Sequence, residues 1–285
     1  MVKCGTSMKK NYPKNINNDY LTPLLIKAPA TWALIRANEI RALDRVTFKH
    51  PVLDVGCGDG FVAKVILSSR KDKFDVGLDL SESEISYARK SGSYKKTIVG
   101  NVYSLPFGNE AFSTVFSNSV IEHIPDLDKS LSEISRVLKP GGEFIITVPT
   151  PYLTKYLLGY RFFNSIGSSF LAKLYGRFFN RLFYHLNLYT DKQWRLIFKE
   201  HQLRLTEHYY YHTPSMIEAH EILAYLAIPY HLTKFIFGHW VVFPELRKHL
   251  VVPWLKKLLN RYYVDDVKKD EGGSVLLIAR KEKVA

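Results

Sequence analysis

Residues 52–60 read VLDVGCGDG, a short apolar run that ends in three glycines spaced one residue apart. An apolar run bounded by glycines predicts a buried strand followed by a tight loop. Residues 61–69 continue with the pattern of a helix, so the glycines join a strand to a helix. Glycines there let a ligand touch the backbone, and the helix that follows offers free N–H groups. This stretch therefore predicts a ligand-binding loop at the carboxyl end of a strand.

Strands and helices alternate on both sides of this loop. The predicted strands are 52–55, 74–80, 97–102, 113–119, 143–149, 203–212 and 272–282. Helices are predicted over 22–46, 61–69, 81–92, 126–142 and 190–202, with Ser81 as a helix cap because Glu84 follows three residues later. This alternation indicates a parallel sheet covered on both faces. We therefore predict an α/β fold, a doubly wound sheet of seven strands with an inserted helical cap.

Two connections are too long for simple loops and define the predicted cap. The predicted segments are an N-terminal helical segment 1–50, a core 51–150, a cap insertion 151–189, a core continuation 190–212, a second cap insertion 213–272 and a last core strand 273–285.

Composition excludes several classes of protein. The chain has 285 residues, of which 46% are apolar, and this argues against disorder. Two cysteines, Cys4 and Cys57, are too few for a disulfide scaffold or a thiolate zinc site, so a reducing cytosol is expected. The basic start is not followed by an apolar run, so no ordinary signal peptide is expected.

Charge and aromatic residues are concentrated in the second half. Residues 151–285 hold 20 Lys and Arg against 11 Asp and Glu, a net charge of +9, whereas residues 1–150 have a net charge of +4. Three interpretations stay open: a cap that forms its own core and an acceptor pocket, peripheral contact with an anionic membrane, and nucleic-acid binding, which is disfavoured because no RNA-binding module is visible. The apolar run 222–243 contains Pro229, Lys234 and two histidines, so it is interpreted as broken amphipathic helices.

An acidic residue ends the second strand. Asp79 follows Gly60 by 19 residues, and an acid at this place in a nucleotide-binding fold accepts hydrogen bonds from both ribose hydroxyls. This is compatible with NAD or with S-adenosylmethionine, although Asp79 could also cap the next helix. No Lys-Ser/Thr follows the glycines, which disfavours a phosphate-binding loop of nucleotide hydrolases.

Taken in order, VLDVGCGDG, GLDLS and the run 100–149 resemble class I S-adenosylmethionine-dependent methyltransferases. The resemblance is closest to the broad group that includes small-molecule and quinone-type enzymes, and it implies a Rossmann-like core. It covers residues 51–150, and residues 185–205 resemble the family's fifth helix and sixth strand more loosely. The two insertions resemble nothing that we can assign.

The resemblance implies S-adenosylmethionine as cofactor and a set of residues that hold it. These are Asp54, Gly56, Cys57, Gly58, Gly60, Asp79, Leu80, Asn101, Val102 and Ser117. The glycines would let the methionine part of the cofactor cross the loop, with Asp54 near its ammonium group and Asp79 on the ribose. Cys57 is expected to be a small packing residue and not a nucleophile.

The adenine and sulfonium ends are assigned in the same way. Leu80, Asn101 and Val102 would lie along the adenine, and Ser117 would face the sulfonium. The family usually has Asp where Asn101 and Ser113 stand. The Asn101 carbonyl oxygen can still accept from the adenine amino group, so binding with altered affinity is expected.

Methyl transfer is an in-line displacement that depends mostly on alignment and on exclusion of water. A general base is needed only when the acceptor holds a proton at high pKa, and no metal is required. His123 is the best candidate base, because a histidine at the matching position acts at the acceptor in phosphoethanolamine-type relatives, although it could simply hydrogen-bond the loop. His185 is a second candidate, and the tyrosines of 209–211 are expected mainly to pack.

The sequence therefore predicts methyl transfer from S-adenosylmethionine to a small-molecule or lipid-like acceptor. The alternatives are a module that binds the cofactor without catalysis, an RNA or protein methyltransferase that uses the basic half, and an NAD-type oxidoreductase. Neither the acceptor nor the oligomeric state can be predicted.

Overall fold

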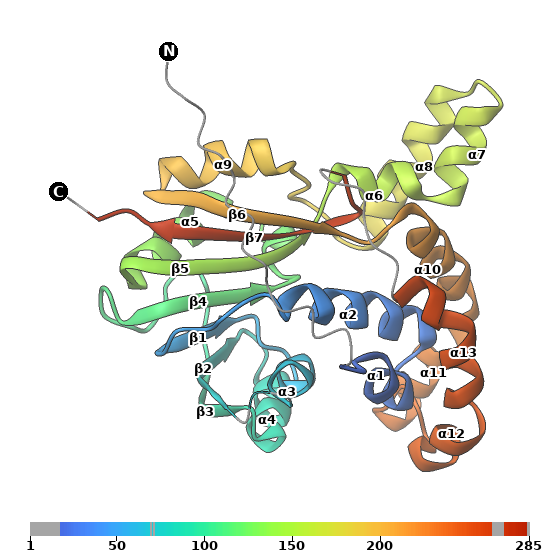
Figure 1. The fold of residues 1–285 in the computed structure, drawn as a ribbon, viewed down its shortest axis with the longest axis horizontal. Coiled ribbons are helices and arrows are strands. Elements are labelled where there is room, and N and C mark those ends of the chain that lie inside the picture. Colours follow the sequence, from blue (N-terminus) through green and yellow to red (C-terminus); the bar gives the residue numbers. More distant parts are fainter. Residues whose placement is uncertain (1–17, 69, 71, 264–270, 284–285) are drawn as a thin grey trace.

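The structure is a computed structural model that describes residues 18–68, 70, 72–263 and 271–283. Expectations for residues 1–17, which include Cys4, and for residues 264–270 of the second insertion lie outside this range. The described residues form one sheet with the strand order β3-β2-β1-β4-β5-β7-β6 (Figure 1). The predicted α/β fold with seven strands is confirmed.

One strand runs against the direction of the others. The strands are β1 (Val52–Val55), β2 (Phe74–Asp79), β3 (Tyr94–Val99), β4 (Phe112–Asn118), β5 (Leu138–Pro149), β6 (Leu203–Tyr211) and β7 (Ser274–Lys281). β1 to β5 pair in parallel, as the alternation predicts, but β7 is antiparallel to both β5 and β6. Its first residue, Ser274, pairs with Tyr211, the last residue of β6. The long connection from β6 to β7 begins at the carboxyl end of β6 and returns to the sheet beside that same end. β7 therefore runs antiparallel to β6.

The helices that cover the sheet largely follow the predicted ranges. They are α3 (Phe61–Leu67), α4 (Glu82–Ser91), α5 (Leu127–Val137) and α9 (Asp191–Glu200). The Ser81 hydroxyl accepts from the Glu84 amide, which confirms the predicted cap. The prediction that α5 continues to the glycines at 141–142 is wrong, because Leu138 already pairs with Phe112 of β4.

Two helices, not one, precede the first strand. α1 (Leu21–Lys27) and α2 (Ala30–Leu43) are separated at Pro29, where the sequence predicts a single helix over 22–46. A proline disfavours the helical conformation of the residue before it and cannot donate to the preceding turn. Ala28 is accordingly extended, with φ −136° and ψ 161°, and the helix ends there.

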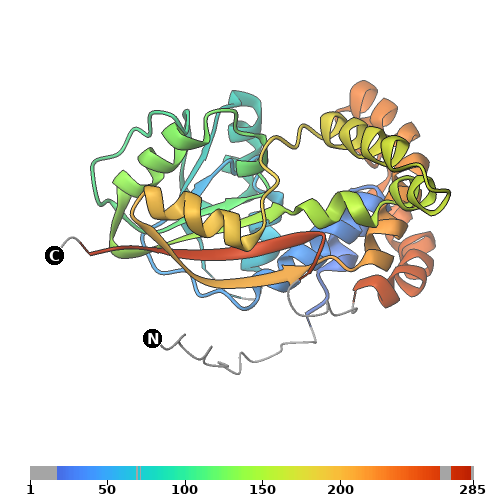
Figure 2. The ribbon, with the colours of Figure 1, turned by 90° about the horizontal axis from the view of Figure 1, so that it is seen from above.

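Both long insertions are helical. They contain α6 (Pro151–Tyr156), α7 (Leu158–Ser165), α8 (Ser169–Leu182), α10 (Pro214–Leu226), α11 (Ile228–Phe237), α12 (Pro244–Leu250) and α13 (Val252–Tyr263). Figures 1 and 2 show these helices gathered with α1 and α2 at the end of the sheet where β5 leads into α6. α2 contacts α10 and α13, and α1 contacts α12 and α13. The helical layer therefore lies beyond the carboxyl ends of the parallel strands, while the exact domain limits stay a prediction.

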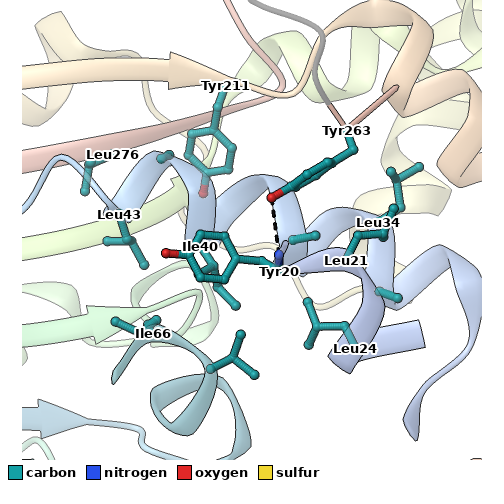
Figure 3. Close-up of a cluster of buried hydrophobic side chains, with 14 of the residues drawn as sticks. Tyr20, Leu21, Leu24, Leu34, Ile40, Leu43, Ile66, Tyr211, Tyr263 and Leu276 are labelled. Carbon is teal, nitrogen blue, oxygen red and sulfur yellow. Dashed lines mark hydrogen bonds between the residues drawn. The ribbon is translucent and has the colours of Figure 1, made fainter. Parts of the chain in front are cut away.

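Two buried clusters cover the two faces of the sheet. Tyr210 belongs to one cluster, and Tyr209 and Tyr211 pack on the other, as the alternation of a strand predicts. Tyr20 lies in the second of these, where its amide donates to the Tyr263 hydroxyl over 3.3 Å (Figure 3). Tyr20 is therefore a core residue.

Candidate functional site

The loop between β1 and α3 has a left-handed backbone at all three predicted glycines. The φ angles of Gly56, Gly58 and Gly60 are +75°, +52° and +74°, a region that side chains with a Cβ rarely adopt. A Cβ on Gly56 would lie 2.5 Å from a methyl carbon of Val120, whereas a Cβ on Gly58 would meet nothing within 4 Å. The loop is thus packed at its start and open at Gly58.

Backbone hydrogen bonds hold the loop against the neighbouring strand. The amides of Gly56 and Cys57 both donate to the Leu78 carbonyl, at 2.7 and 3.0 Å. Burial, followed by the charges of Asp54 and Asp79, raises the pKa of the Cys57 thiol far above its usual range. A thiol that stays protonated is a poor nucleophile, which agrees with the expected packing role.

Asp54 is a buried acid at the end of β1. It is 4% exposed and accepts a hydrogen bond of 2.7 Å from the Tyr94 hydroxyl. Burial, with a further contribution from the negative charge of Asp79, raises the pKa of Asp54 to about 7. A cationic group nearby would favour its carboxylate form.

Asp79 ends β2 and holds two backbone amides. Its Oδ2 accepts from the Gly58 amide and its Oδ1 from the Ser81 amide, both at 2.9 Å. A carboxylate has about four acceptor positions, so both oxygens keep capacity for a ligand. Leu80, the next residue, is 71% exposed. Asp79 therefore positions the loop and presents a carboxylate beside an exposed apolar side chain.

The remaining predicted cofactor residues lie at the ends of β3 and β4. Asn101 is exposed and its Oδ1 accepts from the Tyr103 amide over 2.9 Å, while Val102 is half-buried. Ser117 has no exposed surface, and its hydroxyl donates to the Val55 carbonyl over 3.0 Å. Ser117 is thus buried, and its hydroxyl is bonded to the backbone that leads into the glycine loop.

Sequence reasoning missed a buried carboxylate that joins α2 to the ends of β4 and β6. Glu39 is 1% exposed. Its Oε1 accepts from the hydroxyls of Ser119 (2.6 Å) and Tyr211 (3.2 Å). Its Oε2 accepts from Asn118 Nδ2 (2.9 Å) and from the Arg36 guanidinium (2.5 Å). All the acceptor positions of this buried side chain are used.

The Arg36–Glu39 pair is ionised. Burial alone would raise the pKa of Glu39, but the positive charge of Arg36 and the hydrogen bonds from Ser119, Arg36 and Asn118 outweigh it, so the pKa is lowered. The signal available in the sequence is a pair of opposite charges three residues apart on a mostly apolar helix. The same pattern is common on exposed helices, so only the fold distinguishes the two cases.

A second group of polar side chains follows β4. Glu122 is 2% exposed, and burial raises its pKa to about 8 even though Arg36 is near. Its Oε2 has no partner among the described residues. The neighbouring His123 is 41% exposed in its side chain, and its Nδ1 donates to the Tyr184 carbonyl over 2.9 Å.

The segment after α8 crosses over this group. The amides of Leu186 and Asn187 donate to the Glu122 carbonyl at 2.8 and 3.1 Å. The His185 ring stacks on His123 with centroids 5.8 Å apart, and its buried Nδ1 has no partner within the described part of the chain. Burial, with His123 and His220 nearby, lowers the pKa of His185 to about 4. His185 is therefore neutral at pH 7.

Some of the predicted site residues thus lie together at one edge of the sheet, and the others lie in the core. Asp54, Asp79 and the glycine loop lie at the carboxyl ends of β1 and β2, His123 follows the adjacent β4, and His185 reaches it from the segment after α8. Glu122 Oε2 and His185 Nδ1 are both buried polar atoms with no partner among the described residues, which is the usual mark of a place for water or a polar ligand. The tyrosines of 209–211 lie in the two cores instead.

Comparison with known proteins identifies the middle of the chain. Residues 53–146 match the family model described as "Methyltransferase domain". A probable S-adenosylmethionine-dependent methyltransferase of Mycolicibacterium smegmatis is 34% identical over 98 residues, 34% of this chain and 37% of that protein. A 24-methylenesterol C-methyltransferase 2 of Oryza sativa subsp. japonica is 34% identical over 39% of this chain and 32% of its own length. The chain thus spans about a third of the length of these curated relatives.

Solved structures share the fold over most of the chain. A putative methyltransferase of Haloferax volcanii, solved with the Trm112 methyltransferase activator, covers 93% of this chain and 99% of its own with a TM-score of 0.52 and 17% identity. The [4+2]-cyclase SpnF aligns equally well, with a TM-score of 0.52 and 17% identity over 88% of this chain and 81% of its own. Such likeness shows the fold alone. The family resemblance and S-adenosylmethionine as the cofactor of this domain are confirmed over residues 53–146.

Alanine at position 58 should separate ligand binding from folding. The left-handed backbone costs about 1–2 kcal/mol with a Cβ, but the added methyl group meets no other atom. Because the methyl group projects on the open side of the loop, we expect Gly58→Ala to fold and to bind S-adenosylmethionine more weakly by calorimetry. Gly60→Ala is the contrast: its Cβ would lie 2.7 Å from Ser91 Oγ, so we expect lower thermal stability. Wild-type affinity in Gly58→Ala would show that no ligand passes there.

Removal of the Glu39 carboxylate should destabilise the fold. Glu39→Ala leaves the Arg36 guanidinium without its partner, and we expect the free energy of unfolding in urea to fall by about 3–5 kcal/mol. Glu245→Ala, which breaks the exposed 3.6 Å pair with Lys248, is the matched control and should change stability by less than about 0.5 kcal/mol. Equal effects of the two changes would contradict the structural role of Glu39.

Proposed function

We propose that this chain, whose residues 53–146 form a class I S-adenosylmethionine-dependent methyltransferase domain, transfers a methyl group to a small-molecule or lipid-like acceptor. One observation carries the proposal. The open glycine loop with Asp79 follows β1 and β2, and Glu122 follows the neighbouring β4, where His185 comes in from the segment after α8. Glu122 and His185 each have a buried polar atom that no described residue pairs with. Donor and acceptor groups therefore have adjacent places at one edge of the sheet.

The residues present fit the cofactor. The loop is open at Gly58, the Asp79 carboxylate has spare acceptor positions for ribose hydroxyls, and exposed Leu80 offers an apolar surface to a base. Asp54, with a pKa of about 7, can become the counter-ion of an ammonium group. Bound there, S-adenosylmethionine supplies a methyl group on a positively charged sulfur. Asn101 and Val102 are proposed for the adenine edge, and the buried Ser117 is proposed to support the loop.

The histidines are proposed to serve the acceptor. His185 is neutral at pH 7, and its Nδ1 lone pair has no partner in the described part of the chain. It can therefore accept a hydrogen bond, and transiently a proton, from an acceptor hydroxyl or amine. His123 stacks on His185 and is itself held by the Tyr184 carbonyl, so it is proposed to orient the pair.

The acceptor class is supported by two observations. Relatives over the matched segment include a 24-methylenesterol C-methyltransferase and a malonyl-[acyl-carrier protein] O-methyltransferase of Coxiella burnetii, 32% identical over 121 residues. The segment beside the candidate acceptor side is aromatic: Phe183 packs on Phe179 and on His185, with centroids 4.6 and 5.9 Å apart. An apolar or lipid-like acceptor suits such walls better than a highly charged one.

Cofactor binding tests the first part. Asp79→Ala removes a charged acceptor, and we expect the dissociation constant for S-adenosylmethionine to rise by about one to two orders of magnitude in calorimetry. Asp72→Ala makes the same charge change at an exposed site before β2 and should bind like the wild type. Wild-type affinity in Asp79→Ala, or heat from NAD instead, would contradict the assignment.

Methyl transfer tests the second part. Transfer of labelled methyl from S-adenosylmethionine should appear in lipid or small-molecule fractions of source cells, and Asp79→Ala should reduce it. If the acceptor carries a proton, His185→Ala should lower kcat by about two to four orders of magnitude with little change in cofactor affinity. Label confined to RNA or protein would favour the macromolecular alternative, and an absence of label with intact cofactor binding would favour a non-catalytic module.

A further inference from the structure

Helix α8 buries its small residues together with Phe179, and it exposes most of its large apolar residues. Its contact with α6 is made where Gly176 lies so close to Thr154 that a Cβ would be 2.3 Å from the threonine methyl carbon. Ala172 and Phe179 are the other buried residues of this helix. On the outer side, Phe170, Leu174, Phe178 and Leu182 are 73%, 52%, 63% and 63% exposed. They recur every four residues, so they form one stripe along the helix.

Helix α7, which packs against α8, exposes apolar residues in the same way. α7 continues the pattern with Leu158, Phe162 and the following Ile166, which are 37%, 60% and 60% exposed. Large apolar side chains as exposed as these are unusual in number for a monomer surface and mark an interaction site. We call the exposed apolar residues of α7 and α8 the apolar face.

Positive charge flanks this face. Residues 151–190 contain Lys155, Arg161, Lys173, Arg177 and Arg181 and no Asp or Glu. Lys173, Arg177 and Arg181 lie on α8 at spacings of four, so they form a row beside its apolar stripe. A second copy of this chain would bring the same positive charge against itself, which opposes self-association through this face.

We propose that the apolar face docks on an anionic lipid bilayer, with its side chains in the acyl region and the α8 basic row on the head groups. An amphipathic helix with a basic flank has the composition of an interfacial element. No described helix is long and apolar enough to cross a membrane, and the proposed contact needs none. The idea that the face also admits a lipid-like acceptor rests on the proposed function. α8 leads directly to Phe183 and His185, which supports that route.

Vesicle flotation of the full chain tests docking without any enzymatic readout. We expect co-flotation with vesicles of phosphatidylcholine and phosphatidylglycerol at low salt, less at high salt, and little with phosphatidylcholine alone. Phe170→Ser with Phe178→Ser should weaken partitioning by tenfold or more, since each phenylalanine loses its apolar burial in the bilayer. Leu196→Ser on α9, a 65% exposed residue on a different face, should float like the wild type.

The charge contribution has its own pair of variants. Arg177→Glu with Arg181→Glu should abolish the preference for anionic vesicles, whereas Lys199→Glu on α9 should retain most of it. Calorimetric titration with S-adenosylmethionine checks that each variant is folded, and it also separates this proposal from the methyltransferase assignment.

Three results would overturn docking. The wild type could remain unfloated with both vesicle types, or the α8 variants could float like their α9 controls. The α8 substitutions could instead change the sedimentation coefficient without lipid, which would identify the face as a protein interface.

Discussion

The buried carboxylate of Glu39 is the interaction on which the arrangement of the layers depends. It takes hydrogen bonds from Asn118 and Ser119 at the end of β4 and from Tyr211 at the end of β6, while Arg36 neutralises it from its own helix. A buried charge is tolerated only when its acceptor positions are filled, so α2 has one acceptable position over the sheet edge. Because α2 contacts α10 and α13, this position also sets where the helical layer begins.

The same edge contains three buried acids in different protonation states. Glu39 is held ionised by Arg36, whereas burial raises the pKa of Asp54 to about 7 and that of Glu122 to about 8. At neutral pH the Glu122 carboxyl therefore adds little charge to this edge, and the Asp54 carboxyl is titrating. Below pH 7 a cation bound at Asp54 must displace a proton, so its binding strengthens as the pH rises toward 7. These protonation states suit a charged methyl donor beside Asp54 and a neutral acceptor beside Glu122.

The sequence predicted the sheet and the glycine loop because both depend on local patterns. Apolar runs, the glycines at 56–60 and the cap at Ser81 act within a few residues, and the structure repeats them closely. It did not predict Glu39 or the reversed β7, because their partners are distant in the chain: Glu39 meets Ser119 and Tyr211, and β7 begins beside the end of β6. Pro29 is a local signal for a break between two helices. The helical spacing of apolar residues on both sides of it nevertheless led to the prediction of a single helix.

The insertions show a further limit of periodicity. A stripe of large apolar residues on a helix predicts that the side carrying the stripe is buried. In α8 this rule would bury the side of the helix that is in fact exposed. Close packing against α6 requires small residues, since any Cβ at Gly176 would overlap Thr154, so the side with less apolar area is the one that is buried. Phenylalanines on the other side then remain in water, which is unfavourable for an isolated chain. The orientation of α8 is thus set by steric fit within the protein, and its large apolar side chains are left available to a surface outside it.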